Sequence, residues 1–133
     1  LSGETPGGPK QLEINDRAIP ARAECKGIVW FEFSALCEGP RSAADYIEIA
    51  HDYHTVLLSN VPRLDENRED PALRFVTAVD EFYDRSVKLI LSAAVSSPGE
   101  LYRGEHLAFE FRRTMSRLSE MQGRKYLAQP HRP

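Results

Sequence analysis

The stretch Arg74–Ala93, RFVTAVDEFYDRSVKLILSA, decides the fold of this chain. Its first half is amphipathic, because Phe75, Val79 and Phe82 recur at helical spacing with charged residues between them. Its second half, from Val87 onward, is a short apolar run typical of a buried strand. A helix that leads into such a strand indicates an α/β protein with a parallel sheet, in which ligands usually sit at the carboxyl ends of the strands.

The segments on both sides of this stretch predict further elements of the same two kinds. Ser42 and Asp45 form a capping-box pattern before a helix, and Asp70-Pro71 is typical of the start of the helix that contains Phe75. The remaining predictions are antiparallel strands over 12–19 and 27–33 with a turn at Asn15-Asp16, a helical turn over 34–37, strands over 54–61 and 87–95, a charged loop over 64–70, and a helix from Ala108 to near Gly123. The predicted fold is therefore α/β: a small, mostly parallel sheet with flanking helices, preceded by an N-terminal β-hairpin.

The length and composition of the chain indicate a single globular domain. Its 133 residues are enough for one core, and 41% are hydrophobic and 28% charged. No apolar run approaches the roughly 18 residues of a membrane span, so we expect no transmembrane segment. Residues 1–10 are rich in Gly and Pro and are expected to form a disordered lead-in to an α/β region over 11–127, with a frayed tail over 128–133. Because there is no initiator Met or signal pattern, we expect a piece of a longer chain.

The charge distribution limits the classes of partner. Residues 103–133 carry seven Lys or Arg and three Glu, whereas the whole chain has a net charge of −3. A basic tail on an acidic body suits an anionic partner or an intersubunit contact, although solvated surface charge is the more frequent explanation. Aromatic residues are not interleaved with these basic residues as a stacking surface, so we expect no binding to nucleic acid.

The cysteines and histidines predict no metal site. Cys25 and Cys37 lie outside any CxxC or Cys/His spacing, which favours free thiols over zinc or redox chemistry. The four histidines lack ligand spacing, and no Ser, His and Asp set suggests a hydrolytic triad.

Asp80-Glu81 superficially matches the acidic motif of P-loop ATPases, in which a strand ends in these two residues. The helical spacing of Phe75, Val79 and Phe82 instead puts the pair in mid-helix on the polar face, either solvated or paired with arginines. The chain also contains no GxxxxGK[ST] sequence to hold phosphates. We therefore expect no ATP hydrolysis by these residues alone.

Two arginines and one serine are the candidates for contact with a ligand. Arg113 and Arg117 are one helical turn apart and share a face, so their guanidinium groups suit phosphate oxygens. Salt bridges, for example to Glu110 or Glu120, are the more common role of such a pair. Ser92 lies near the end of an apolar strand, where a polar side chain either reaches a ligand or caps the strand.

Several motifs in sequence order resemble a known family. They are WFEFSALC at 30–37, PRSAADY at 40–46, LLSNVP at 57–62, RF at 74–75, VDEFYD at 79–84, LY at 101–102 and FRRTMSRLSEM at 111–121. Together they resemble the C-terminal portion of the AFG-like (ZapE) ATPases, which are AAA+-type P-loop ATPases. The resemblance covers about residues 12–127 and implies that the chain is the last third of such an ATPase.

The resemblance implies that ATP and Mg²⁺ bind to the full-length parent protein. The family's phosphate-binding loop lies upstream of the matched segment, so the fragment alone is predicted to be inactive and to bind no cofactor. Arg113 and Arg117 match the Arg-rich family motif and are the candidates for an arginine finger or second sensor. Arg41 and Arg74 are weaker candidates, which we group with Ser92 as nucleotide-binding.

The resemblance also implies partners and a location. The partners are the rest of the parent ATPase, further copies in a homo-oligomer and a cell-division protein at the Z-ring. The implied location is cytoplasmic and peripheral at the division site, or mitochondrial in a eukaryote. The alternative is a non-catalytic interaction module that binds a division or proteolysis partner without nucleotide.

Overall fold

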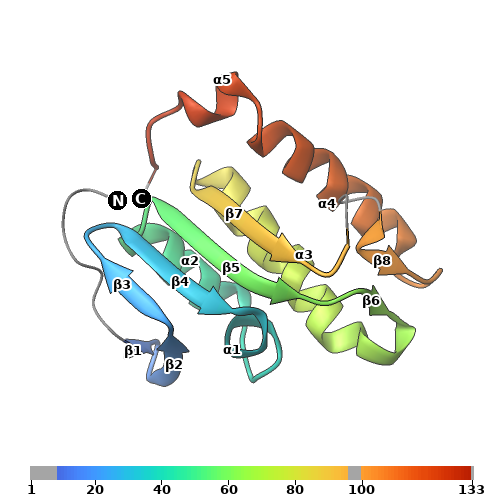
Figure 1. Cartoon of the computed structure of the whole chain (residues 1–133), viewed down its shortest axis with the longest axis horizontal. Helices are drawn as coiled ribbons and strands as arrows, with labels where there is room; N and C mark the ends of the chain where they lie inside the picture. Colours follow the sequence, from blue (N-terminus) through green and yellow to red (C-terminus); the bar gives the residue numbers. More distant parts are fainter. Residues whose placement is uncertain (1–8, 96–99, 133) are drawn as a thin grey trace.

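A four-stranded sheet in the order β3-β4-β5-β7 forms the centre of the molecule (Figure 1). The computed structural model describes residues 9–95 and 100–132. The sheet consists of β3 (Ala23–Cys25), β4 (Ile28–Glu32), β5 (Thr55–Val61) and β7 (Lys88–Ala93). β3 and β4 are antiparallel, whereas β4, β5 and β7 run parallel, so the predicted mostly parallel sheet is confirmed.

A β-hairpin precedes this sheet, as predicted. It consists of β1 (Lys10–Ile14) and β2 (Arg17–Ala21), with Leu12 opposite Ile19. Asn15 and Asp16 form the turn with φ angles of 50° and 65°, and these residue types accept the left-handed region at low cost. The strand β3 was not predicted separately, because its three residues are too few to show a periodic pattern.

Helices α1 (Phe33–Cys37), α2 (Ala43–Asp52) and α3 (Glu69–Asp84) accompany the parallel strands. The predicted capping box at the start of α2 is present, since the Asp45 carboxylate accepts from the Ser42 backbone N–H at 2.9 Å. α3 begins at Glu69, earlier than Asp70-Pro71 suggested, and the 3₁₀ helix η1 (Glu66–Arg68) precedes it. The predicted charged loop over 64–70 was therefore wrong, because its first two residues also belong to a short strand, β6 (Leu64–Asp65). Acidic residues in the first turn of α3 are favoured by the helix dipole.

The C-terminal third adds helices α4 (Ala108–Met121) and α5 (Arg124–Leu127) beside α3 (Figure 1). α4 packs on α3 through the stacked rings of Phe111 and Phe75, with centroids 6.3 Å apart. A second small sheet, which the sequence did not predict, joins β6 (Leu64–Asp65) to β8 (Tyr102–Arg103). Tyr102 stacks on Phe111 at 4.6 Å and so fixes this sheet against α4.

The core lies between the sheet and the helices α2 and α3. Phe31, Val56 and Leu58 point into it from the strands, and Phe75 and Phe82 from α3. Figure 1 shows both helices behind the sheet. The prediction that β7 is a buried strand was therefore wrong for one of its faces, because the residues described here cover the sheet with helices on one side only.

Two predicted regions fall partly outside the described residues. The lead-in over 1–10 is described only from Pro9, and β1 begins at Lys10. Frayed residues over 128–133 stay a prediction, although the backbone N–H of Arg132 donates to the Arg85 carbonyl at 2.9 Å. In the described part of the chain, no helix is both long and apolar enough to cross a membrane.

Candidate functional site

Arg113 and Arg117 lie on one face of α4, as their spacing predicted, and both reach Asp80 on α3. Arg117 pairs with one carboxylate oxygen of Asp80, and Arg113 Nη2 lies 3.4 Å from the other. The guanidinium of Arg117 also lies over the ring of Tyr83, 5.0 Å from its centroid. Arg117 is 26% exposed, whereas Arg113 is 51% exposed and makes the longer of the two contacts to Asp80. The structure therefore brings the two arginines together and leaves Arg113 the more accessible.

The carboxylate that pairs with Arg113 and Arg117 is that of Asp80, whereas the sequence suggested Glu110 or Glu120. Glu120 instead accepts a hydrogen bond from the Tyr83 hydroxyl at 2.6 Å, and this bond raises the pKa of Tyr83. The remaining acidic residue of the VDEF segment, Glu81, pairs with Arg85 at 2.7 Å. The interpretation of Asp80 and Glu81 as partners of arginines on a helix face is thus confirmed.

Arg41 and Arg74 line a second site, a cavity of about 230 Å³ between the start of α2 and the first half of α3. Asp70 also lines the cavity. Arg41 Nε donates to the Ala35 carbonyl at 3.0 Å, and Arg74 Nη1 to the Cys37 carbonyl at 3.3 Å. Within residues 9–95 and 100–132, neither guanidinium forms an ion pair, so their charges are not neutralised by a carboxylate in contact.

Two titratable groups near these arginines, Cys37 and Tyr46, are held in their neutral forms. Burial raises the pKa of the Cys37 thiol to about 12, and Arg74 and Arg41 offset only part of this rise. Burial also raises the pKa of Tyr46, whose hydroxyl donates to the Leu36 carbonyl at 2.9 Å. Since both groups stay neutral near pH 7, neither the Cys37 thiol nor the Tyr46 hydroxyl adds a negative charge beside the two arginines.

Ser92 lies near the carboxyl end of β7 and is exposed. No hydrogen bond or ion pair between described residues joins it to either arginine pair. Nearby, the sequence reasoning missed Asn60, which has a φ of 60° at the irregular end of β5 and donates to Glu32 at 2.8 Å. Its signal was the polar Ser59-Asn60 pair just before Val61-Pro62 at the end of an apolar strand.

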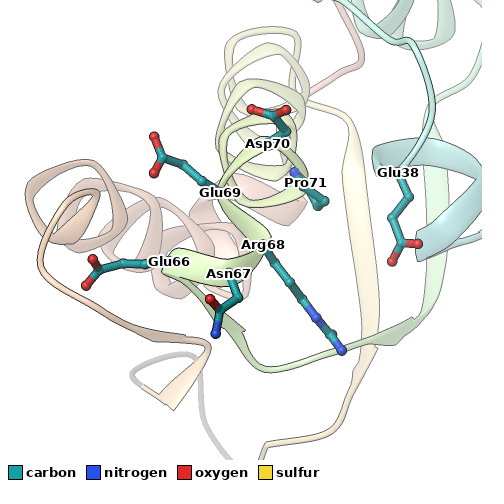
Figure 2. A pocket seen from close by; sticks show the side chains of 7 residues that line it. All are labelled: Glu38, Glu66, Asn67, Arg68, Glu69, Asp70 and Pro71. Atoms are coloured by element: carbon teal, nitrogen blue, oxygen red, sulfur yellow. The ribbon is translucent and has the colours of Figure 1, made fainter.

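A larger cavity, of about 610 Å³, shares Asp70 with the cavity of Arg41 and Arg74 but has none of the predicted site residues in its lining. Its lining consists of Glu38, Glu66, Asn67, Arg68, Glu69, Asp70 and Pro71. Figure 2 shows the Arg68 side chain directed toward the Glu38 side, whereas Glu66 and Glu69 point away from it. Across the described ranges, no three His, Cys, Asp or Glu side chains are grouped so that they could hold a metal ion. The acidic lining is unsuited to a phosphate.

Comparisons with known proteins agree on one family. The sequence model of the family described as AFG1-like ATPase matches residues 1–130. The cell division protein ZapE of Escherichia coli K12 is 43% identical over 120 residues, which are 90% of this chain and 32% of that protein. Lactation elevated protein 1 homolog B of Danio rerio is 32% identical over 149 residues, covering 89% of this chain and 30% of that protein.

An uncharacterized protein of Schizosaccharomyces pombe is 31% identical over 152 residues, covering 94% of this chain and 34% of its own length. The chain thus spans about a third of the length of the curated relatives it matches. No solved structure matches it.

Proposed function

Since the chain belongs to the AFG1-like ATPase family, we propose that it is the C-terminal part of an AAA+-type ATPase whose nucleotide is bound by the rest of the protein. Two observations support this. The relatives are about three times as long as the matched segment. The 133 residues contain no GxxxxGK[ST] sequence, so ATP and Mg²⁺ bind to the remaining part.

Arg113 is the residue that acts on the nucleotide, as an arginine finger or second sensor. The observation that carries this assignment is its accessibility: the Arg113 side chain is half-exposed, and its one ion pair with a described residue is the 3.4 Å contact to Asp80. An arginine that stabilises charge on a transferring phosphoryl group must reach a nucleotide held elsewhere, so it needs a free guanidinium. Arg117, which is tied to Asp80 and Tyr83, positions the pair and contributes its charge.

Arg41 and Arg74 form a second, weaker candidate contact to nucleotide. Their cavity of about 230 Å³ presents two guanidinium groups that hydrogen-bond only to backbone carbonyls, among the residues described. Guanidinium donors that are not bound to a carboxylate remain available to phosphate oxygens. Ser92 is a weak candidate of the same kind, at the carboxyl end of β7.

We propose that the parent ATPase works as a homo-oligomer, because an exposed arginine finger can be supplied in trans to a nucleotide that another chain holds. The similarity to a cell division protein supports a role at the division site, with a cell-division protein as partner. The parent protein would then act in the cytoplasm, peripherally at that site, or in the mitochondrion if the source is eukaryotic.

The test is steady-state ATP hydrolysis by the full-length protein with Arg113→Ala, and separately with Arg117→Ala. We expect a loss of about a thousandfold in turnover for Arg113→Ala, which is typical of an arginine finger. Arg112→Ala is the matched control: it removes the same charge from the preceding position of α4, and Arg112 forms no ion pair with any described residue. Unchanged turnover in both the Arg113 and Arg117 variants would overturn the catalytic assignment.

A second function, as a non-catalytic interaction module, is favoured by one observation. Phe109 on α4 is 68% exposed, the highest value among the exposed large hydrophobic side chains of the described residues. On this alternative, the full-length protein binds a division or proteolysis partner without nucleotide, and Phe109→Ser abolishes the binding while ATP turnover is kept. Binding that requires ATP, or that survives Phe109→Ser, would contradict the alternative.

A further inference from the structure

Within residues 9–95 and 100–132, one face of the central sheet carries no helix (Figure 1). Side chains alternate along β4, β5 and β7, so Val29, Phe31, Val56 and Leu58 point to α2 and α3, and their neighbours point to the opposite side. We call the opposite side the open sheet face. Its members, matched across the strands, are Ile28, Thr55 and Lys88 in one row, Trp30, Leu57 and Ile90 in the next, and Glu32 and Ser59 in the third. Figure 1 shows this face toward the viewer.

The middle of the open sheet face is apolar and accessible. Ile90 is 56% exposed, and Trp30 and Leu57, in the same row, are only partly buried. Sheets of parallel strands are almost always covered on both faces, because each strand buries two sets of side chains. A contiguous apolar surface with no cover is costly in water and marks a site of contact.

Polar groups surround this apolar centre. At the carboxyl ends of the strands, Glu32 accepts hydrogen bonds from Arg22 at 2.6 Å and from Asn60 at 2.8 Å. The guanidinium of Arg22 also lies 4.3 Å from the ring centroid of Trp30. Lys88 stands at the amino-terminal end of β7. An apolar centre with a polar rim is the usual composition of a protein interface.

We propose that the open sheet face is covered by the rest of the same polypeptide, the two thirds of a full-length family member that these 133 residues do not include. The inference rests on the proposed function in one respect, that the chain is part of a longer ATPase. The relatives are long enough to contain a segment that covers this face, since the matched segment is 32% of one relative and 30% of another. Covering this face gives the parallel sheet its second layer and places Ser92, which follows Ile90 by two residues, beside the remaining part.

The first measurement is the rate of maleimide labelling of single cysteines in the native full-length protein, each relative to its rate in the urea-unfolded protein. Ile90→Cys reports on the open sheet face. Leu73→Cys on α3 and Leu127→Cys on α5 are matched controls, because the three side chains are 56%, 47% and 45% exposed in the structure. Cys25 is replaced by Ser so that it does not compete. We expect Ile90→Cys to react roughly tenfold or more slowly than the controls, as for a site that reacts only on local opening.

The second measurement identifies what covers the face. A photo-crosslinking amino acid at position 90 is activated in a mixture of isotopically light and heavy full-length protein. We expect crosslinks within one chain to residues outside the 133. Light-to-heavy crosslinks would overturn the proposal in favour of a second copy, and equal labelling of all three cysteines would overturn it in favour of a free face.

Lys88→Cys, on the same face, replaces Ile90→Cys if the latter does not fold. Neither readout depends on ATP hydrolysis. The proposal that the open sheet face is covered can therefore hold even if Arg113 and Arg117 prove not to be catalytic.

Discussion

Arg117 on α4 and Asp80 on α3 form an ion pair that joins the last long helix to the helix in the middle of the chain. Arg113, one turn before Arg117, reaches the other oxygen of the same carboxylate at 3.4 Å. One acidic side chain therefore holds two guanidinium groups that would otherwise repel each other. This explains why a segment that resembles a hydrolysis motif contains an Asp: its carboxylate is the counter-charge of the candidate catalytic arginines.

The Asp80 and Arg117 pair is expected to contribute a small, measurable coupling. A double-mutant cycle with Asp80→Asn and Arg117→Gln should give a coupling free energy of about 1 kcal/mol or less, since both side chains are partly exposed. The measurement is the free energy of unfolding in urea. The same cycle with Arg113→Gln in place of Arg117→Gln should give less, because that contact is longer. A larger coupling for Arg113 would contradict the geometry.

Asp45 should matter more to stability than any other carboxylate of α2. It is buried, it caps the helix at the Ser42 N–H, and it accepts from Asn15 at 3.2 Å and from Arg17, so it also fastens the hairpin to α2. Asp45→Ala should lower the free energy of unfolding by about 2–3 kcal/mol, from the lost cap and the lost partners. The matched change Glu48→Ala, on the exposed side of α2, should stay within about 0.5 kcal/mol. Equal effects of the two changes in urea unfolding would disprove this role.

Tyr126 attaches the C-terminal helix to the body through its hydroxyl. This hydroxyl donates to the Val87 carbonyl at 2.6 Å and lies 3.2 Å from the Phe82 carbonyl, and the side chain is buried. Tyr126→Phe should cost about 1–2 kcal/mol, because the Val87 carbonyl loses its partner in a buried place. Tyr83→Phe, which removes an accessible hydroxyl bonded to Glu120, should cost about 0.5 kcal/mol or less. Thermal unfolding of the two variants compares them, and a reversed order would count against the assignment.

His106 should titrate above its ordinary range. Its ring nitrogen Nδ1 lies 2.9 Å from Glu69 Oε1, and this hydrogen bond, followed by the charge of Glu69, raises the pKa of His106 above 6.5. A raised folded pKa means that the pair stabilises the fold below about pH 6.5 and that this contribution is lost as pH rises through the folded value. An NMR titration of the ring should show the raised value, and Glu69→Gln should return it to the ordinary range. If the pKa of His106 stays raised in Glu69→Gln, then Glu69 is not its cause.

The sequence predicted the elements whose signal is local and long. The spacing of Phe75, Val79 and Phe82 identified α3, and the apolar runs identified β5 and β7. The strands β3, β6 and β8 escaped prediction because they have two or three residues each, and what defines them is a pairing with a distant segment. The start of α3 was placed late because Glu69-Asp70 looks like loop, although acidic residues suit the first turn of a helix.

The site was predictable only in part, for the same physical reason. The spacing of Arg113 and Arg117 fixed their common face, but their partner Asp80 lies more than thirty residues earlier, and only the packing of α4 on α3 brings it close. Arg41 and Arg74 likewise meet only in the folded chain. The apolar run of β7 did not reveal that one of its faces is open. An apolar run indicates that a strand is buried, but it does not show which segment of the protein covers each face.

The most direct test of the proposed function is the single-turnover rate of ATP hydrolysis by the full-length protein, measured with enzyme in excess over ATP. Arg113→Ala is compared with Arg112→Ala, which removes the same charge from the neighbouring position of the same helix. We expect Arg113→Ala to slow the hydrolysis step by about a thousandfold, whereas Arg112→Ala leaves it near the unmodified rate. Equal rates for the two variants would contradict a catalytic role of Arg113.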